Sequence, residues 1–473
     1  MAGTGPRTGY VLVLRLELSD VPGTLGRVTT AIGEDGGDIG NIDLVGQFGR
    51  KVLREVIVTC RNEAHAHELT AKARAVEGVR VLEVGDRTFL AHQGGKLAIV
   101  SKLPLKSPDD LSVAYTPGVG RVSQAIAADP ERVWDLTIKG NSVAVLTDGT
   151  AVLGLGAIGP AAAMPVMEGK AALFKEFADI DAYPICVDVA GPEELIAVAK
   201  AIAPGFGGIN LEDIAAPACF EVEERLRREL DIPVFHDDQH GTAVVVLAAM
   251  SNACRVVGKR LAGLRVVVLG AGAAGIACAR LLLHAGVRDL VAVDLGGILH
   301  PGRAAELDPQ RRWLMEHSNP RGLAGGLDVA LAGADAFVGV SGPGALPPAL
   351  AATMAPQAIV FALANPVPEI VPDEVPPNVA VVATGRSDFP NQINNVLVFP
   401  GFFRGLLDAR ARTVTDDMKA AAARGLASLV DDRELDADFV IPSVFDRRVA
   451  PAVSRAVQET VERTGLSRLV ESG

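Results

Sequence analysis

The chain has 473 residues, of which 49% are hydrophobic and 22% are charged, and its formal net charge at pH 7 is -12. This length exceeds what one hydrophobic core supports, so two or three domains of an ordinary soluble globular protein are expected. The negative charge argues against nucleic acid or an anionic membrane as a partner, because both bind clustered lysine and arginine.

The N-terminal region lacks the pattern of a targeting or membrane segment. Its apolar run from Tyr10 to Leu14 is far shorter than the ~18 residues of a membrane span and predicts a strand. The cysteines lie far apart without a CxxC pair, which predicts core packing in a reducing cytoplasm rather than a zinc or disulfide framework. They are Cys60, Cys186, Cys219, Cys254 and Cys278.

Residues 9–85 are predicted to form a small α+β domain. "YVLVLRLEL" (10–18) alternates as a strand does, and "DVPGTLGRVTTAIGEDGG" (20–37) predicts a turn and a helix closed by glycines. Two strands (39–47 and 51–60), a helix ending near Gly78 and a last strand (79–84) follow. The order βαββαβ is typical of a ferredoxin-like fold with an antiparallel sheet.

The string "LSDVPGTLGRVTTAIGEDGGDIGNIDL" (18–44) resembles the ACT domain. The resemblance implies a regulatory unit in which a small ligand, often an amino acid, binds near Asp20 to Leu25. A dimerisation module that binds no ligand fits the same pattern equally well.

The rest of the chain predicts an α/β region. The composition of residues 86–110, which include "GG" and "LPLKSPDD", predicts a linker that leads into the next domain. From about residue 111 onward, apolar strand-like runs alternate with helix-length segments. This alternation is typical of parallel sheets with helices on both faces.

Two stretches match GxGxxG. The first, "LGLGAIGP" (153–160), runs into a glycine-, alanine- and proline-rich segment that predicts a tight loop rather than a helix start. The second, "LRVVVLGAGAAGIACARLLLHAGVRDLVAVDLGG" (264–297), has a strand, a glycine loop, a helix and a second strand ending in Asp294. This context predicts a Rossmann-type dinucleotide-binding domain over residues 261–473. The expected cofactor contacts are Gly270, Gly272, Ala273, Ala274, Gly275 and Asp294.

The acidic residue at the end of the second strand bears on the choice of dinucleotide. Asp294 can accept hydrogen bonds from a ribose and repels a 2'-phosphate, and no lysine or arginine follows it before Arg303. The sequence therefore favours NAD over NADP.

The stretch "IPVFHDDQHGTAVVV" (232–246) places two adjacent carboxylates after an apolar strand. Its histidines, His236 and His240, resemble a zinc-protease pair, but Gly241 predicts that the helix begins there, which would put the imidazoles on different faces. About 25 residues upstream, a second acidic pair also ends a strand. The two pairs predict a Mg²⁺ or Mn²⁺ site, and helix N-capping by Asp213 and Asp238 is the alternative.

Several further strings resemble the malic enzymes, in particular their compact bacterial branch, over roughly residues 95 to 460. They are "AYTPGV" (114–119), "VMEGKAALF" (166–174), "GGINLEDI" (207–214), "VFHDDQHGTA" (234–243), "ALANP" (362–366) and "GRSDFPNQINNVLVFPG" (385–401). The resemblance implies a substrate- and metal-binding domain over residues 111–260, ahead of the Rossmann domain.

The resemblance also assigns roles to residues. It implies Glu212, Asp213 and Asp238 as metal ligands, with Asp237 as a neighbouring carboxylate that orients the site. It implies Lys170 as the general base, which for work near neutral pH needs a pKa about 3 units below the ordinary ~10.4, and Tyr115 as the acid that protonates the enolate. The amides implied to contact nicotinamide ribose or substrate are Asn365, Asn394 and Asn395.

Two positions depart from the family pattern. Ala151 stands where larger malic enzymes carry an arginine that holds a substrate carboxylate, so another group must hold C4 of malate. Ala157 replaces a polar residue in the first glycine loop.

The predicted reaction is the metal-dependent oxidative decarboxylation of L-malate to pyruvate and CO₂ with reduction of NAD(P), where NAD is favoured and NADP stays open. A malolactic enzyme that returns the hydride to give lactate is one alternative, and a non-catalytic metabolite sensor is another. The family and the ACT-like unit both imply a homodimer or a higher homo-oligomer.

Overall fold

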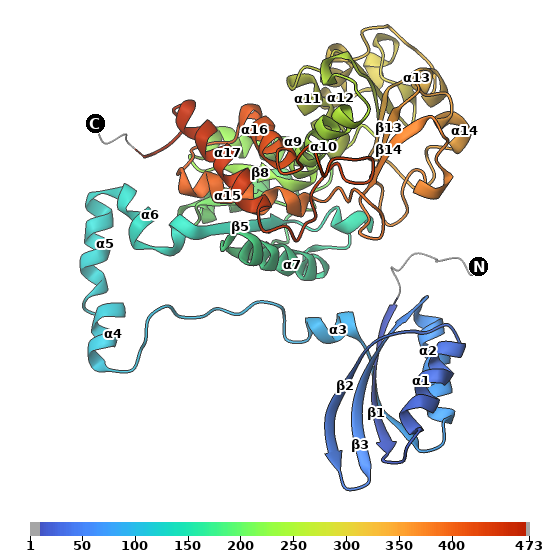
Figure 1. Ribbon diagram of the computed structural model, residues 1–473. Coiled ribbons are helices and arrows are strands. Elements are labelled where there is room, and N and C mark those ends of the chain that lie inside the picture. Colours follow the sequence, from blue (N-terminus) through green and yellow to red (C-terminus); the bar gives the residue numbers. More distant parts are fainter. Residues whose placement is uncertain (1–9, 470–473) are drawn as a thin grey trace. The chain divides into compact units, whose positions relative to one another are not determined.

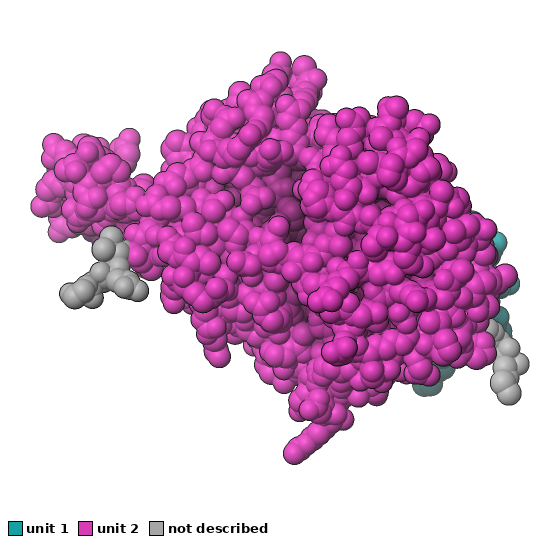
Figure 2. Space-filling view, turned by 90° about the horizontal axis from the view of Figure 1, so that it is seen from above, with its two compact units in different colours: residues 1–96 teal, residues 97–473 magenta. Residues whose placement is uncertain are grey.

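The computed structural model describes residues 10–469. The chain forms two compact units, unit 1 with residues 1–96 and unit 2 with residues 97–473 (Figures 1 and 2).

Unit 1 is a four-stranded antiparallel sheet in the order β2-β3-β1-β4, with two helices on one face (Figure 1). This topology confirms the predicted βαββαβ ferredoxin-like arrangement. The elements are β1 (Tyr10–Ser19), α1 (Thr24–Glu34), β2 (Asp38–Phe48), β3 (Lys51–Cys60), α2 (Glu63–Ala75), β4 (Val79–Asp86) and α3 (Arg87–His92). The short helix α3 lies where the sequence predicted a linker.

The core of unit 1 follows from the alternation of β1. Leu12, Leu14, Leu16 and Leu18 are all buried, because successive side chains of a strand point to opposite faces and these share one. They pack against apolar side chains of α1 and α2. Unit 1 therefore has a hydrophobic core of its own.

Unit 2 contains two parallel sheets. The smaller has the order β6-β5-β7-β8, and β5 is buried along its whole length. The larger has the order β11-β10-β9-β12-β13-β14 and is parallel except for β11. The strands are β5 (Ser142–Thr147), β6 (Asp181–Cys186), β7 (Gly208–Leu211), β8 (Val234–His236), β9 (Arg265–Leu269), β10 (Asp289–Asp294), β11 (Gly297–Ile298), β12 (Ala336–Gly339), β13 (Ala358–Ala362) and β14 (Val379–Thr384).

Helices connect and cover these strands, which confirms the predicted α/β class. The main ones are α7 (Pro160–Ala178), α8 (Pro192–Ile202), α9 (Ala218–Glu229), α10 (Asp237–Val256), α11 (Ala273–His284), α12 (Pro309–His317), α15 (Phe399–Asp408), α16 (Asp416–Ala427) and α17 (Val449–Arg463). The shorter ones are α6 (Val133–Leu136), α13 (Leu327–Leu331) and α14 (Pro348–Ala351). No helix in residues 10–469 is long and apolar enough to cross a membrane.

Helix α10 joins the two sheets of unit 2. It leaves β8 of the smaller sheet, is buried along most of its length, and contacts α11 and α16. The predicted start near Gly241 was wrong, since the helix begins at Asp237 and continues through this glycine. A Cβ at position 241 would lie 2.1 Å from Asp237 Oδ1, so the glycine is required by close packing rather than by a turn.

A second expectation that the structure corrects concerns the first glycine loop. The segment after "LGLGAIG" is not a poor helix start but the first turn of α7, with Pro160 as its first residue. Proline is well suited to this position, because its fixed φ is already helical and a first-turn N–H has no partner within the helix.

The stretch between unit 1 and residue 128 carries little core. It contains α4 (Pro108–Ala114) and α5 (Val119–Ala128), neither of which has a buried residue. Figure 1 shows both helices extending away from the sheets of unit 2. We call residues 97–128 the arm.

The separate core of unit 1 leads to a first prediction. Leu14→Ala removes a side chain that is completely buried in that core, so it should lower the stability of unit 1 by about 2–5 kcal/mol. Scanning calorimetry of the full chain should show one transition moved and that of unit 2 unchanged. Val21→Ala, at a residue 58% exposed in the same unit, is the control. A shift of both transitions by Leu14→Ala would contradict independent cores.

Candidate active site

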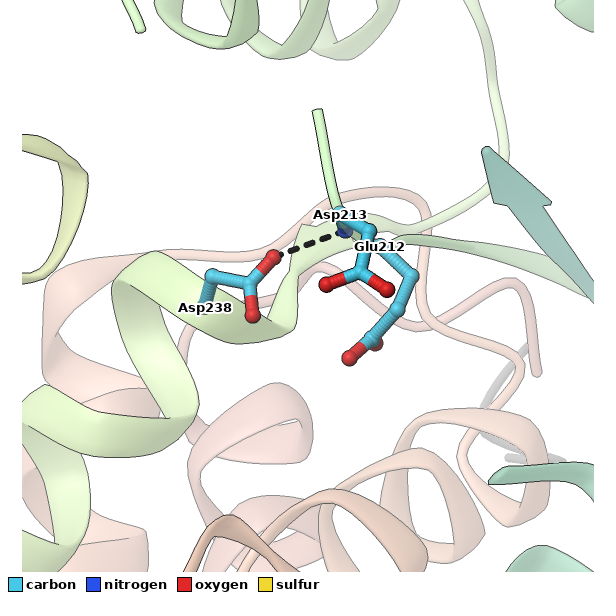
Figure 3. A group of neighbouring side chains, drawn as sticks. All are labelled: Glu212, Asp213 and Asp238. Carbon is cyan, nitrogen blue, oxygen red and sulfur yellow. Dashed lines mark hydrogen bonds between the residues drawn. The ribbon is translucent and has the colours of Figure 1, made fainter. Parts of the chain in front are cut away.

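Three carboxylates from two neighbouring strand ends meet in unit 2. Glu212 and Asp213 follow β7, and Asp238 lies in the first turn of α10, just after β8. Because β7 and β8 are paired in parallel, their carboxyl ends lie at the same edge of the sheet. Figure 3 shows the three side chains turned toward one another, and one oxygen of each lies within 4.8 Å of the others.

The backbone fixes this arrangement. Asp213 has a left-handed conformation with φ of 54°, which is uncommon for a residue with a side chain and is typical of functional sites. Its N–H donates to Asp238 Oδ2 at 2.8 Å, the bond drawn in Figure 3. Glu212 Oε2 accepts from Asn210 Nδ2 at 2.8 Å. The carboxylates are therefore held in place before any cation binds.

The electrostatics of the cluster indicate a cation site. Burial, followed by the charge of Asp238, raises the pKa of Asp213 to about 7. Burial also raises the pKa of Glu212, assisted by the neighbouring aspartates. Asp213 Oδ2 is buried without a hydrogen-bond partner. Oxygen ligands that repel one another and leave an oxygen unsatisfied suit a hard divalent cation such as Mg²⁺ or Mn²⁺.

Lys170, on α7, lies against this cluster. Its Nζ donates to Asp237 Oδ2 at 2.5 Å, lies 3.0 Å from Glu212 Oε1, and stands 4.3 Å from the centre of the Phe399 ring. Burial lowers the pKa of Lys170, but the charges of Asp237 and Glu212 outweigh it and raise the pKa above its ordinary value. The expected lowering is therefore absent without a metal, because the same carboxylates hold the proton on the lysine.

Asp237 joins Lys170 to the second half of unit 2. Its Oδ2 also accepts from Asn395 Nδ2 at 3.1 Å, and Thr242 Oγ1 donates to Asn395 Oδ1 at 3.0 Å. Asp237 is fully buried. The sequence analysis did not identify Thr242, which lies about one turn further along α10, because its partner Asn395 is distant along the chain.

Two of the predicted amides and the tyrosine lie outside this network. The Asn394 side chain accepts from Val396 N–H and so caps its own turn. Asn365 follows β13 and packs near Gly385. Tyr115 directly follows α4 and is 67% exposed, and Figure 1 shows α4 at a distance from α7. Within the single chain, Tyr115 does not reach Lys170.

The histidines of the "HDDQH" stretch do not join the carboxylates as ligands. His236 precedes α10 and is fully buried. The His240 Nε2 is 2.6 Å from Glu223 Oε1, and its Nδ1 is 3.1 Å from Lys419 Nζ. Neither ring nitrogen of His236 has a hydrogen-bond partner, whereas His240 is engaged by Glu223 and Lys419, and neither histidine belongs to the group of three carboxylates.

The glycine loop between β9 and α11 fits a dinucleotide. Gly272 precedes α11 without a side-chain cap, so the N–H groups of Ala273, Ala274 and Gly275 open the helix and suit a pyrophosphate. A Cβ at Gly275 would lie 1.7 Å from the carbonyl oxygen of Gly270. Only glycine permits this tight turn at the end of β9.

Asp294, at the end of β10, has an ion-pair partner that the sequence analysis missed. Arg303 Nη1 donates to Asp294 Oδ1 at 2.7 Å and Nη2 donates to Oδ2 at 3.2 Å, and Arg311 lies 4.0 Å away. The intervening "GGILHPG" segment folds back and brings a distant cation to the carboxylate. Glycines at 296, 297 and 302 were the sequence feature that could have predicted that the chain folds back here.

The geometry agrees with comparisons to known proteins. Models of the malic enzyme N-terminal domain and the malic enzyme NAD binding domain match residues 94–194 and 239–462. The chain belongs to the malic enzyme family.

Close relatives extend this result. The NAD-dependent malic enzyme of Geobacillus stearothermophilus is 52% identical over 457 residues, 97% of this chain and 95% of that protein. The bifunctional malic/malolactic enzyme of Bacillus subtilis is 51% identical over 79% of this chain and 92% of its own length. The crystal structure of malic enzyme from Pyrococcus horikoshii has a TM-score of 0.77 and 49% identity, over 80% of this chain and 89% of that chain.

The raised pKa of Asp213 leads to a second prediction. Below about pH 7 this carboxyl of the metal-free protein holds a proton, which Mn²⁺ must displace. Mn²⁺ affinity measured by calorimetry should therefore rise about tenfold per pH unit from pH 5.5 and level off above 7. Asp213→Asn should weaken binding and flatten the profile, and Asp179→Asn, at an exposed site, should change neither. A flat profile in the unsubstituted enzyme would contradict this assignment.

Proposed function

We propose that this malic enzyme converts L-malate to pyruvate and CO₂ with reduction of NAD. The observation that carries the proposal is the contact of a lysine ammonium with a buried carboxylate cluster that has the form of a divalent-cation site. When bound, the cation supplies a Lewis acid for the hydroxyl and carbonyl oxygens, and NAD supplies the hydride acceptor.

Lys170 is the proposed base for the C2 hydroxyl proton. In the metal-free chain, Glu212 and Asp237 together hold the lysine in its charged form. Once Glu212 directs its charge toward a cation, less negative charge faces the lysine, and its pKa falls toward the range of a base. Asp237 then keeps Nζ in place through their 2.5 Å hydrogen bond.

The amides have positioning roles in this proposal. Asn395 donates to Asp237 and accepts from Thr242, so it keeps Asp237 aligned with Lys170. Its amide can also bind a substrate carboxylate. Asn365 lies at the carboxyl end of a strand of the larger sheet, where open α/β folds bind ligands. We propose Asn365 as the contact to nicotinamide ribose or substrate.

The third prediction tests this function. Purified enzyme with Mn²⁺ and L-malate should reduce NAD faster than NADP and form one pyruvate per NADH. Lys170→Ala should lower kcat at least 100-fold while Mn²⁺ binding persists. Lys175→Ala, on the same helix but half-exposed, should retain normal turnover.

Product identity separates the alternatives. Lactate without net NADH would indicate a malolactic enzyme, an activity named in the B. subtilis relative. Mn²⁺ and NAD binding without turnover under any condition would indicate a sensor. Unchanged turnover in Lys170→Ala would refute the assigned base.

We further propose that the chain acts as a homo-oligomer assembled through the arm. Leu111 and Val113 on α4 and Tyr115 directly after it are between 54% and 73% exposed, although they are mostly apolar. They lie on more than one side of the helix, and a second copy of the chain would cover part of them. Since Tyr115, the proposed proton donor, belongs to the arm, assembly also sets where its hydroxyl lies.

The fourth prediction addresses this assembly. Light scattering after size-exclusion chromatography should give a mass of at least two chains. Val113→Asp should yield single chains with reduced turnover, because a charge then occupies the apolar surface. Asp109→Asn on the same helix should leave both unchanged. A monomeric unsubstituted enzyme with full turnover would refute the proposal.

Unit 1 is proposed as a regulatory domain that binds a small ligand near Asp20 to Leu25. Asp20 to Gly23 precede α1, which begins at Thr24, and Gly23 has a φ of 91°. The Geobacillus relative matches over 97% of this chain, so the similarity includes most of unit 1. Screening amino acids for a change in turnover of the full chain tests the role.

A further inference from the structure

A buried carboxylate connects the loops that follow two neighbouring strands of the larger sheet. Glu369 is fully buried and lies in the segment after β13. A Cβ at Gly339, the last residue of β12, would lie 2.6 Å from the carboxyl carbon of Glu369 and 2.8 Å from its Oε1. The carboxylate therefore occupies the carboxyl end of β12, in space that a side chain at position 339 would otherwise fill.

Both oxygens of Glu369 accept hydrogen bonds from the backbone. Oε1 accepts from the N–H of Ser341 at 2.8 Å and from its hydroxyl at 3.1 Å, and Oε2 accepts from the N–H of Ala364 at 3.0 Å. Ser341 belongs to the loop after β12, and Ala364 to the loop after β13. Glutamine has the same shape but only one acceptor oxygen, so it could hold only one of the two N–H groups.

The two loops border the dinucleotide site. A Cβ at Gly270, in the glycine loop, would lie 2.4 Å from the carbonyl oxygen of Val340 and 3.4 Å from the backbone nitrogen of Ser341. The loop after β12 therefore packs directly against the glycine loop. Asn365 lies one residue beyond the hydrogen bond of the second loop, and both Ser341 and Asn365 are exposed. Their side chains are thus accessible to a ligand.

The strand order relates these loops to one half of the dinucleotide. In the larger sheet β9 lies between β10 and β12, and the pyrophosphate is expected at the loop after β9. Asp294, at the end of β10, is then on the side of the adenosine ribose. The loops after β12 and β13 lie on the opposite side of β9, which is the side expected for the nicotinamide half.

We propose that Glu369 is a positioning residue of the dinucleotide site, which holds the loops after β12 and β13 so that Ser341 and Asn365 contact the nicotinamide half of NAD. The carboxylate itself touches no ligand, because it is fully buried. It acts by fixing the two loops relative to each other through its hydrogen bonds. This inference rests on the proposed function for the role of Asn365, and it adds Ser341 as a second contact and Glu369 as the group that aligns both.

The test compares NAD with ADP, which contains the adenosine and the diphosphate of NAD without the nicotinamide half. Binding of each to the full-length enzyme is measured by calorimetry, in buffer without malate or divalent cations. Glu369→Gln should raise the Kd for NAD about tenfold or more, because the new amide leaves one backbone N–H of the loops without an acceptor. The Kd for ADP should change by less than about threefold.

Two controls and a second variant accompany this measurement. Glu374→Gln changes an exposed carboxylate a few residues further along, and it should bind both nucleotides like the unsubstituted enzyme. Mn²⁺ affinity should be equal in all variants, because the carboxylate cluster lies at the smaller sheet. If Glu369→Gln does not fold, as judged by thermal unfolding, Ser341→Ala removes the hydroxyl but keeps the N–H. It should weaken NAD binding about threefold and leave ADP binding unchanged.

Three outcomes would overturn the proposal. The first is an NAD affinity that Glu369→Gln, or Ser341→Ala in its place, leaves unchanged. The second is a loss of ADP affinity as large as the loss of NAD affinity, which would mean that the carboxylate supports the whole domain. The third is an unsubstituted enzyme that binds neither nucleotide.

Failure of the proposed function would be recognised separately. The binding measurements need no turnover, so they test Glu369 whether or not the enzyme converts malate. An enzyme that binds NAD in the expected pattern but forms no pyruvate would contradict the proposed reaction and leave the role of Glu369 intact.

Discussion

The repulsion among carboxylates at the ends of β7 and β8 is the constraint on which the active site depends. Lys170 offsets part of this charge through Asp237 and Glu212, and a divalent cation is suited to offset the rest. The same contacts explain why the lysine is charged in the metal-free chain. In the proposed mechanism, metal binding and activation of the base are therefore linked, because both compete for the charge of Glu212.

The fold supplies what these charges require. Parallel strands bring their carboxyl ends to one edge, and Asp237 and Asp238 lie in the first turn of α10, where the helix dipole favours negative charge. The buried length of α10 then continues toward α11, whose first turn follows the dinucleotide loop. One helix thus connects the cation site to the nucleotide-binding half.

Arg303 shows how a residue brought near by the fold changes the surroundings of Asp294. Asp294 was expected to meet a ribose alone, and NAD was favoured because no cation followed closely in sequence. In the structure Arg303 holds both oxygens of Asp294. The family assignment supports NAD binding. The negative charge of Asp294 is, however, offset by Arg303, which the sequence did not predict, because the chain folds back on itself.

The sequence by itself determined most strands, the βαββαβ order of unit 1, the glycine loop and the residue types of the proposed cation site. These features depend on local alternation, on backbone conformation or on strings long enough to carry a family pattern. The tertiary structure alone decided the charge state of Lys170, the partner of Asp294, the start of α10 and the exposure of Tyr115. Each of these depends on groups far apart along the chain, whose distance and burial set the electrostatic energy and the packing.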